Sequence, residues 1–69
     1  MMNRTPVGSS NIASVGYENG TLEIAFMDGG LYQYLDVPEP IFNSLMQAYS
    51  KGKFFHAYIK NCYRTIRLG

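Results

Sequence analysis

The residues best suited to chemistry are four basic side chains near the C-terminus: Lys53, His56, Lys60 and Arg64. Their spacing of three or four residues places the ends of these side chains along one side of a predicted helix. Such a row can bind phosphate or carboxylate groups, but an ordinary solvated helix face has the same pattern. The row therefore leaves two interpretations open, an anion-binding surface and a plain exposed face.

The distribution of charge along the chain favours a binding surface over a catalytic centre. Residues 1–40 hold one cation, Arg4, against five acids, a net charge of −4, whereas residues 41–69 hold five cations and no acid, a net charge of +5. The isoelectric point of the chain is only about 7.9, whereas nucleic-acid-binding domains typically lie above about 9. Such asymmetry carries information about partners and none about the fold.

A small phosphate-bearing ligand needs fewer contacts than a long nucleic acid: roughly two to four cations, some backbone amides and an aromatic plane or two. The C-terminal third of the chain supplies these groups. The polar cluster Ser9-Ser10-Asn11 could also contact phosphate oxygens, although such clusters more often form a turn or a strand cap. The predicted ligand-binding residues are Ser10, Asn11, Lys53, His56, Tyr58, Lys60, Tyr63, Arg64 and Arg67.

The sequence predicts no catalytic or metal site. A general base needs a partner within about 3 Å, and no nucleophile or orienting acid for His56 is identifiable. His56 and Cys62 are the only residues of their kinds, too few for the ligands of a structural zinc site. Cys62 follows the apolar spacing of Phe55 and Ile59, which predicts an inert core thiol. We therefore expect no enzymatic activity, no metal and no cofactor.

Two strands joined by a tight turn are predicted in the first half of the chain, at Ile12–Glu18 and Leu22–Phe26. Asn19-Gly20 between them is the strongest short hairpin signal, because both central positions of a type I′ turn need positive φ. The predicted cross-strand pairs are Tyr17 with Leu22, Val15 with Ile24 and Ala13 with Phe26, all on one face.

A third strand is predicted at Leu31–Val37, after a hairpin loop of three residues, Asp28-Gly29-Gly30. This glycine pair lacks the following helix and lysine of a phosphate-binding loop. The predicted pairs are Phe26 with Tyr32 and Ile24 with Tyr34. This register turns both tyrosines toward the core, which we prefer to the alternative of base stacking on RNA.

Helices are expected to cover the apolar face of this three-stranded antiparallel meander. Pro38 and Pro40 suit a helix start, and the i, i+3, i+4, i+7 stripe of the first helix is Phe42, Leu45, Met46 and Tyr49. Ser50-Lys51-Gly52 is expected to end it, with Gly52 in the left-handed closing position. A second helix is predicted from about Lys53 to Asn61, with Phe55, Ile59 and Cys62 inward. Alternation over residues 63–68 predicts a C-terminal strand that completes the sheet.

The fold class is therefore α+β, in one domain over residues 10–69 that follows a loose lead-in of residues 1–9. A chain this short buries only about 60% of its unfolded surface. We therefore expect a homo-oligomer, with a ligand pocket between its subunits because one small core leaves no room for a cavity. The lone cysteine fits a reducing compartment, and no apolar run resembles a signal peptide or a membrane span, so we expect a cytoplasmic protein.

An ordered series of residues resembles the KTSC domain from about Val7 to Leu68. The series is Ser10, Ile12, Gly16-Tyr17, Leu22-x-Ile24-x-Phe26, Gly30, Tyr32-x-Tyr34, Val37-Pro38, Ala48-x-Ser50-x-Gly52, Phe54-Phe55 and residues 59–63. The KTSC domain is a small module at the C-terminus of some lysyl-tRNA synthetases and also occurs in free-standing bacterial and phage proteins. The resemblance implies a compact α+β domain, suspected RNA binding and no established catalysis, and it supplies no set of binding residues.

These observations favour a non-catalytic protein that captures a nucleotide or other phosphate-bearing small molecule in a homo-oligomer. In a phage, such a protein would sequester a host signalling nucleotide. The alternative is an RNA-binding module of the tRNA type, by family analogy. A further alternative is a protein–protein interaction module that sets the acidic end of one copy against the basic end of another.

Overall fold

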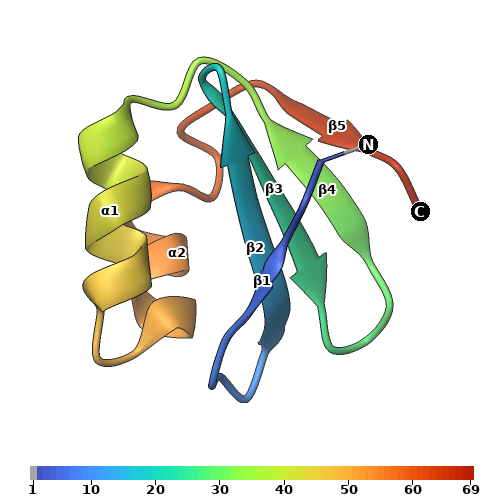
Figure 1. Ribbon diagram of the computed structural model, residues 1–69, viewed down its shortest axis with the longest axis vertical. Coiled ribbons are helices and arrows are strands. Elements are labelled where there is room, and N and C mark those ends of the chain that lie inside the picture. The colour runs from blue at the N-terminus through green and yellow to red at the C-terminus, as the bar shows by residue number, and fades with distance from the viewer. Residues whose placement is uncertain (1) are drawn as a thin grey trace.

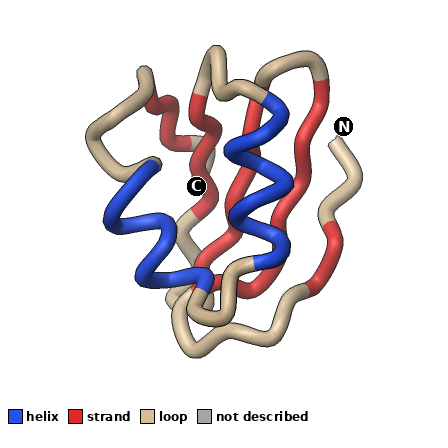
Figure 2. The backbone as a smooth tube through the Cα atoms, turned by 90° about the vertical axis from the view of Figure 1, so that its left-hand side faces the viewer, coloured by secondary structure: helices blue, strands red, loops and turns tan. Residues whose placement is uncertain are grey.

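The protein folds as one antiparallel sheet with two helices on one of its faces (Figures 1 and 2). The computed structural model describes residues 2–69. Its elements are β1 (Thr5–Pro6), β2 (Ile12–Glu18), β3 (Thr21–Phe26), β4 (Leu31–Tyr34), α1 (Glu39–Gln47), α2 (Lys51–Tyr58) and β5 (Thr65–Arg67). The order in the sheet is β1-β2-β3-β4-β5. The α+β class and the C-terminal strand are thus confirmed, and β5 pairs with β4 of its own chain.

The β2–β3 hairpin has the predicted turn. Asn19 and Gly20 both have positive φ, 51° and 83°, as a type I′ turn requires. The pairs Tyr17 with Leu22 and Val15 with Ile24 are confirmed.

The predicted pair of Ala13 with Phe26 is wrong, because the register shifts between Ile12 and Ser14 and Ile12 is the residue opposite Phe26. A β-bulge places one extra residue in its strand. Here it turns Ile12 toward the core, where its side chain is completely buried.

The loop between β3 and β4 has the predicted length but begins one residue earlier, at Met27-Asp28-Gly29. The Gly29 N–H donates to the Phe26 carbonyl, and Gly29 has φ 101°. The third position of the loop therefore favours glycine, which tolerates positive φ. The predicted register is therefore wrong: Ile24 lies opposite Tyr32 and Leu22 opposite Tyr34. A shift of two residues keeps every side chain on its expected face.

The two helices also differ from their predicted bounds. Ala48 ends α1 in an extended conformation, so Tyr49 lies outside the apolar stripe and is fully exposed, at 105%. Ser50 then caps α2 by accepting a hydrogen bond from the Lys53 N–H. Gly52 accordingly lies in the first turn of α2. The prediction that Gly52 closes α1 is therefore wrong.

The core lies between the helices and the inner face of the sheet. Its buried residues are Ile12, Val15, Leu22, Ile24, Tyr34, Val37, Leu45, Phe55 and Ile59. Phe55 and Ile59 are inward, as predicted. Cys62 is exposed, so the prediction of a core thiol is wrong: α2 ends at Tyr58 and Asn61 has φ 64°, which breaks the helical spacing.

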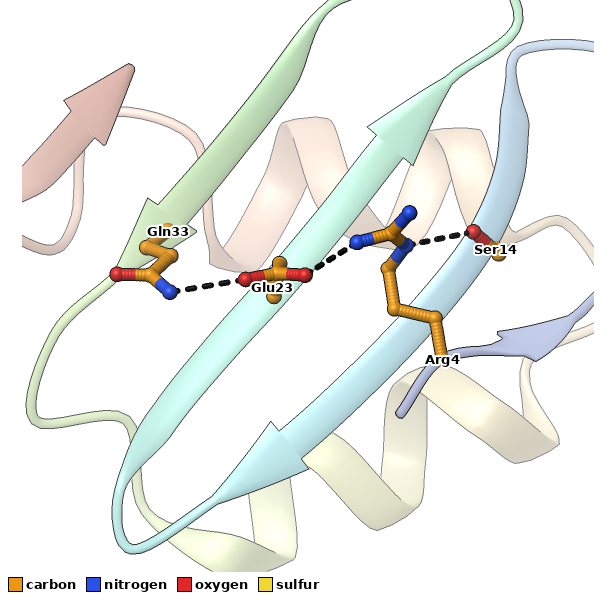
Figure 3. Close-up of polar contacts among 4 residues, drawn as sticks. All are labelled: Arg4, Ser14, Glu23 and Gln33. Atoms are coloured by element: carbon orange, nitrogen blue, oxygen red, sulfur yellow. Dashed lines mark hydrogen bonds and ion pairs between the residues drawn. The ribbon is translucent and has the colours of Figure 1, made fainter. Parts of the chain in front are cut away.

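The N-terminal segment lies against the outer face of the sheet. Residues 1–9 were expected to be loose, but Thr5–Pro6 pair with β2, and a Cβ added to Gly16 would lie 2.6 Å from the Asn3 carbonyl oxygen. Glu23, only 4% exposed, forms an ion pair with Arg4 and accepts a hydrogen bond of 2.8 Å from Gln33 (Figure 3). Arg4 also donates to the Ser14 hydroxyl. We call Arg4, Ser14, Glu23 and Gln33 the outer-face network.

Candidate functional site

A cleft of about 570 Å³ opens between α2, the segment after it and one end of the sheet. We call it the main cleft. Its lining residues are Ser10, Asn11, Ile12, Phe26, Met27, Asp28, Tyr32, Tyr34, Gly52, Phe55, His56, Lys60, Asn61 and Thr65. A pocket between subunits was expected on grounds of size, but one chain is sufficient to form a cleft of ligand size. The reason is that the cleft is open to the surface beside the core and takes no volume from it.

Aromatic rings form the base of the main cleft. Phe55 contacts Phe26 and Tyr34 edge to face, with centroid distances of 5.3 and 5.5 Å, and Phe26 contacts Tyr32 in the same way at 5.7 Å. Aromatic pairs prefer this arrangement, which fixes the rings relative to one another. Burial, with a smaller contribution from Tyr32, raises the pKa of Tyr34 to about 12. Tyr34 therefore keeps its hydroxyl proton at neutral pH.

The turn before β2 supplies one polar rim of the cleft. The Ser9 hydroxyl accepts hydrogen bonds from the N–H groups of Asn11 and Ile12, and Ser10 donates to the Asn11 side-chain oxygen at 3.2 Å. The Met27 N–H donates to the Asn11 carbonyl at 2.8 Å, which ties this turn to the β3–β4 loop. Ser9 is thus the local cap, and Ser10 with Asn11 faces the cleft.

The second rim comes from α2 and the turn that follows it. The buried residues Phe55 and Ile59 anchor this segment to the core. His56 and Lys60 each follow one of these anchors in the chain, and both are exposed at the edge of the cleft. The positive φ of Asn61 then turns the chain toward β5, whose Thr65 completes the lining.

The predicted binding residues are divided by the structure. Ser10, Asn11, His56 and Lys60 meet in the main cleft. Arg67 lies beside it, with its guanidinium carbon 5.6 Å from the centre of the Tyr32 ring. The remaining members lie elsewhere: Lys53 in a neighbouring hollow, Tyr58 against Phe54 at 4.7 Å, Tyr63 packed against the core, and Arg64 on the surface outside both hollows.

The neighbouring hollow, of about 670 Å³, lies at the start of α2, and we call it the side cleft. Its lining residues are Gly8, Ser9, Ser10, Asn11, Tyr49, Ser50, Lys51, Gly52, Lys53, His56 and Ala57. Lys51 donates to the Ala48 carbonyl at 3.2 Å, so its ammonium is held at the end of α1. Sequence reasoning missed Tyr49 as a surface residue because it fits the helical stripe of α1.

Among the described residues, the cations around the two clefts form no ion pair. Across residues 2–69 the one ion pair is Arg4 with Glu23, on the opposite face of the sheet. Asp28 also lines the main cleft, and its carboxylate accepts the Gly30 N–H at 2.9 Å. The clefts therefore present ammonium, imidazole, hydroxyl and amide groups and one carboxylate beside an aromatic surface.

Sequence reasoning also missed the aromatic base of the main cleft. Phe26, Tyr32, Tyr34 and Phe55 follow core spacing and were interpreted as core residues. Tyr34 and Phe55 are indeed buried, and all four also line the cleft. The alternation of Tyr32 and Tyr34 at the end of a predicted strand was the one sequence signal for this aromatic base.

Among residues 2–69 no group of three or more His, Cys, Asp or Glu side chains is placed to hold a metal ion. Neither described helix has the length and apolar character needed to cross a membrane.

Comparison with known proteins gives consistent matches. The family model of the KTSC domain matches residues 8–63. The crystal structure of a KTSC domain protein from Yersinia pestis superposes with a TM-score of 0.95, at 46% identity, over 100% of both chains.

Sequence relatives come from several bacteria. A protein of Tsukamurella paurometabola is 35% identical over 91% of this chain and 97% of its own length. A protein of Stutzerimonas stutzeri is 38% identical over 86% of each chain. A lysine–tRNA ligase of Nostoc is 39% identical over 70% of this chain, a match that spans 9% of the ligase.

Proposed function

The chain belongs to the KTSC domain family, and from this premise we propose that it is a non-catalytic protein that captures a nucleotide or another phosphate-bearing small molecule in the main cleft. Capture without chemistry would suit sequestration of a signalling nucleotide. A cytoplasmic location and the absence of catalysis are part of this proposal.

The observation that carries the proposal is the composition of the main cleft. Its aromatic base offers apolar surface to a planar ring, and Lys60 with His56 offers groups that bind a phosphate. Its volume of about 570 Å³ falls in the range of about 300–1,000 Å³ typical of small-molecule sites. Arg67, whose Nε–H donates to the Gly69 carbonyl, lies over Tyr32 and adds a further cation near this cleft.

Polar groups around the rim could distinguish one ligand from another. The Asn11 carboxamide and the Ser10 and Thr65 hydroxyls can donate and accept hydrogen bonds, and Asp28 can only accept when ionised. An acceptor beside cations suits a molecule that carries both hydroxyl or amino groups and a phosphate. Nucleotides have this combination.

The test is calorimetric titration of the protein with each of the ribonucleoside 5′-monophosphates. We expect saturable binding with one ligand per chain. Lys60→Ala should weaken it about tenfold, equivalent to about 1.4 kcal/mol. Arg64→Ala removes an equally exposed cation outside both clefts and should leave affinity unchanged. Equal losses from the two variants would show attraction to overall charge and would contradict the proposal.

Binding of RNA is the second candidate, favoured by two observations. One relative is a lysine–tRNA ligase, and Lys53 and Arg64 extend the basic surface beyond the main cleft. RNA binding through several phosphates predicts an affinity that falls steeply with salt and rises with oligonucleotide length. An affinity that is independent of both would exclude this candidate.

Self-association is a separate part of the proposal. β5 is an edge strand, and its residue Ile66 and the following Leu68 are 43% and 49% exposed. Exposed edge strands offer unpaired backbone groups to another chain, so we propose that β5 of a second copy pairs there. Sedimentation analysis should show a dimer that Ile66→Lys converts to a monomer, whereas a monomeric parent protein would exclude this pairing.

A further inference from the structure

We propose that the main cleft and the side cleft together bind one ligand of two nucleotide units joined through phosphate. One unit would occupy each cleft. This inference rests on the proposed function and extends it to the class of ligand.

The two clefts share part of their lining. Ser10, Asn11, Gly52 and His56 border both, so the two clefts adjoin at this shared border. Each cleft, at about 570 and 670 Å³, is large enough for a small ligand by itself. A single mononucleotide would leave one of them unused.

At the shared border the Asn11 side chain lies close to Gly52 of α2. A Cβ added to Gly52 would lie 3.2 Å from the Asn11 side-chain nitrogen, closer than an ordinary contact. The glycine therefore lets the Asn11 carboxamide lie directly against α2. The linking phosphate would lie over this contact, on the solvent side of the border, where the exposed His56 ring and the amide of Asn11 can donate hydrogen bonds to its oxygens.

Tyr49 gives the side cleft an aromatic plane. Its side chain is 105% exposed, so it contributes no packing to the protein. Tyr58, the comparable exposed tyrosine, is instead covered on one side by Phe54. A free aromatic face is the feature on which a second base can stack. Lys53, beside Tyr49 in the lining, has no ion-pair partner within residues 2–69.

The experiment compares ribonucleoside monophosphates with ribodinucleoside monophosphates in the same calorimetric assay. We expect a preferred dinucleotide to bind more tightly than its component mononucleotide. Tyr49→Ala should lower dinucleotide affinity about tenfold, within the range of base–aromatic stacking, and leave mononucleotide affinity unchanged. Lys53→Ala should act in the same selective way. Tyr49→Phe keeps the aromatic plane and should bind normally, and Tyr58→Ala is the matched exposed control.

Two results would overturn the inference. If dinucleotides bind no more tightly than mononucleotides, or if Tyr49→Ala and Tyr58→Ala have equal effects, the side cleft takes no part. In both cases the proposed function still holds when mononucleotide binding depends on Lys60, and it fails only when that dependence is also absent.

Longer oligonucleotides distinguish the two possible sources of the ligand. A free dinucleotide as ligand predicts that added nucleotides leave affinity unchanged or lower it. The end of an RNA chain predicts that longer oligonucleotides with the same terminal pair bind at least as tightly as the pair itself.

Discussion

The charged side chains on the two faces of the sheet differ in burial and in pairing. On the outer face, the Glu23 carboxylate is buried and held by Arg4 and Gln33 (Figure 3). On the helical side, Lys60 and its neighbours are exposed and without an ion-pair partner among residues 2–69. Burial of a charge is costly unless the charge is paired, so the ion pair of the outer face contributes to the stability of the fold. The cations of the clefts are free to meet a ligand, and the two faces should therefore respond differently to mutation.

The largest effect on stability is expected from Arg4→Ala, which leaves the Glu23 carboxylate buried with Gln33 alone. Breaking a fully buried pair costs about 3–5 kcal/mol. The Arg4 side chain is 29% exposed, so we expect a loss of about 2–3 kcal/mol in the free energy of unfolding, measured by urea denaturation. Ligand affinity should be unchanged. A loss below about 0.5 kcal/mol, the scale of ordinary surface substitutions, would mean that water replaces Arg4.

Gly16→Ala should have the next largest effect. Its Cβ would lie 2.6 Å from the Asn3 carbonyl, so the N-terminal segment must move away from the sheet. Overpacking of this kind costs about 1–3 kcal/mol. Gly8→Ala is the matched control, because an added Cβ there meets nothing within 4 Å. Equal stability of the two variants would show that residues 2–4 do not rest on the sheet.

The pH dependence of stability should reflect the buried Glu23 carboxylate of the outer face. Burial tends to raise the pKa of Glu23, but hydrogen bonds from Gln33 and Arg4 outweigh it and hold the pKa below the ordinary value of 4.5. A lowered folded-state pKa adds stability above the unfolded-state pKa, and this stability is lost as the pH falls through the folded-state value. Denaturation curves below pH 4.5 should therefore show a decline, and the decline should be shallower in Glu23→Gln. An identical decline in both proteins would assign it to other groups.

The smallest effect on stability is expected for Lys60→Ala. The side chain is exposed and has no ion-pair partner in the described part of the chain, so the change should stay within about 0.5 kcal/mol in the same denaturation assay. Loss of ligand affinity with unchanged stability would be the reverse of the Arg4→Ala result. A Lys60→Ala variant as unstable as Arg4→Ala would remove the distinction between the two faces.

Local chemistry was readable from the sequence, and features set by distant contacts were not. Asn19-Gly20 defines its own turn, so this turn and the two pairs nearest to it were predicted correctly. The bulge near Ala13 accompanies the hydrogen bond from the Met27 N–H to the Asn11 carbonyl. No local sequence pattern predicts this contact. The β3–β4 loop was misplaced because registers two residues apart expose the same faces.

The candidate site was predicted in the same uneven way. Helical spacing is enough to put His56 and Lys60 on one side of the chain. The same spacing wrongly predicts that Cys62 is buried, because Asn61 leaves the helical conformation before that residue. Ser10 and Asn11 reach the cleft through the fold of the whole sheet. The aromatic base escaped notice because the same rings pack the core and line the cleft, and spacing does not separate these roles.

The order of strands in the sheet indicates which strand separates most easily from the rest. Strands β1 to β4 follow one another along the chain, whereas β5 reaches its place only after both helices. It has three residues, all exposed, and short exposed elements open at a lower free energy than the core. In a chain whose β5 is not paired with a second copy, we therefore expect amide hydrogens of β5 to exchange with solvent sooner than those of β3. Because β5 carries Thr65 and Arg67, each such opening would widen the main cleft, and a bound ligand would slow the exchange.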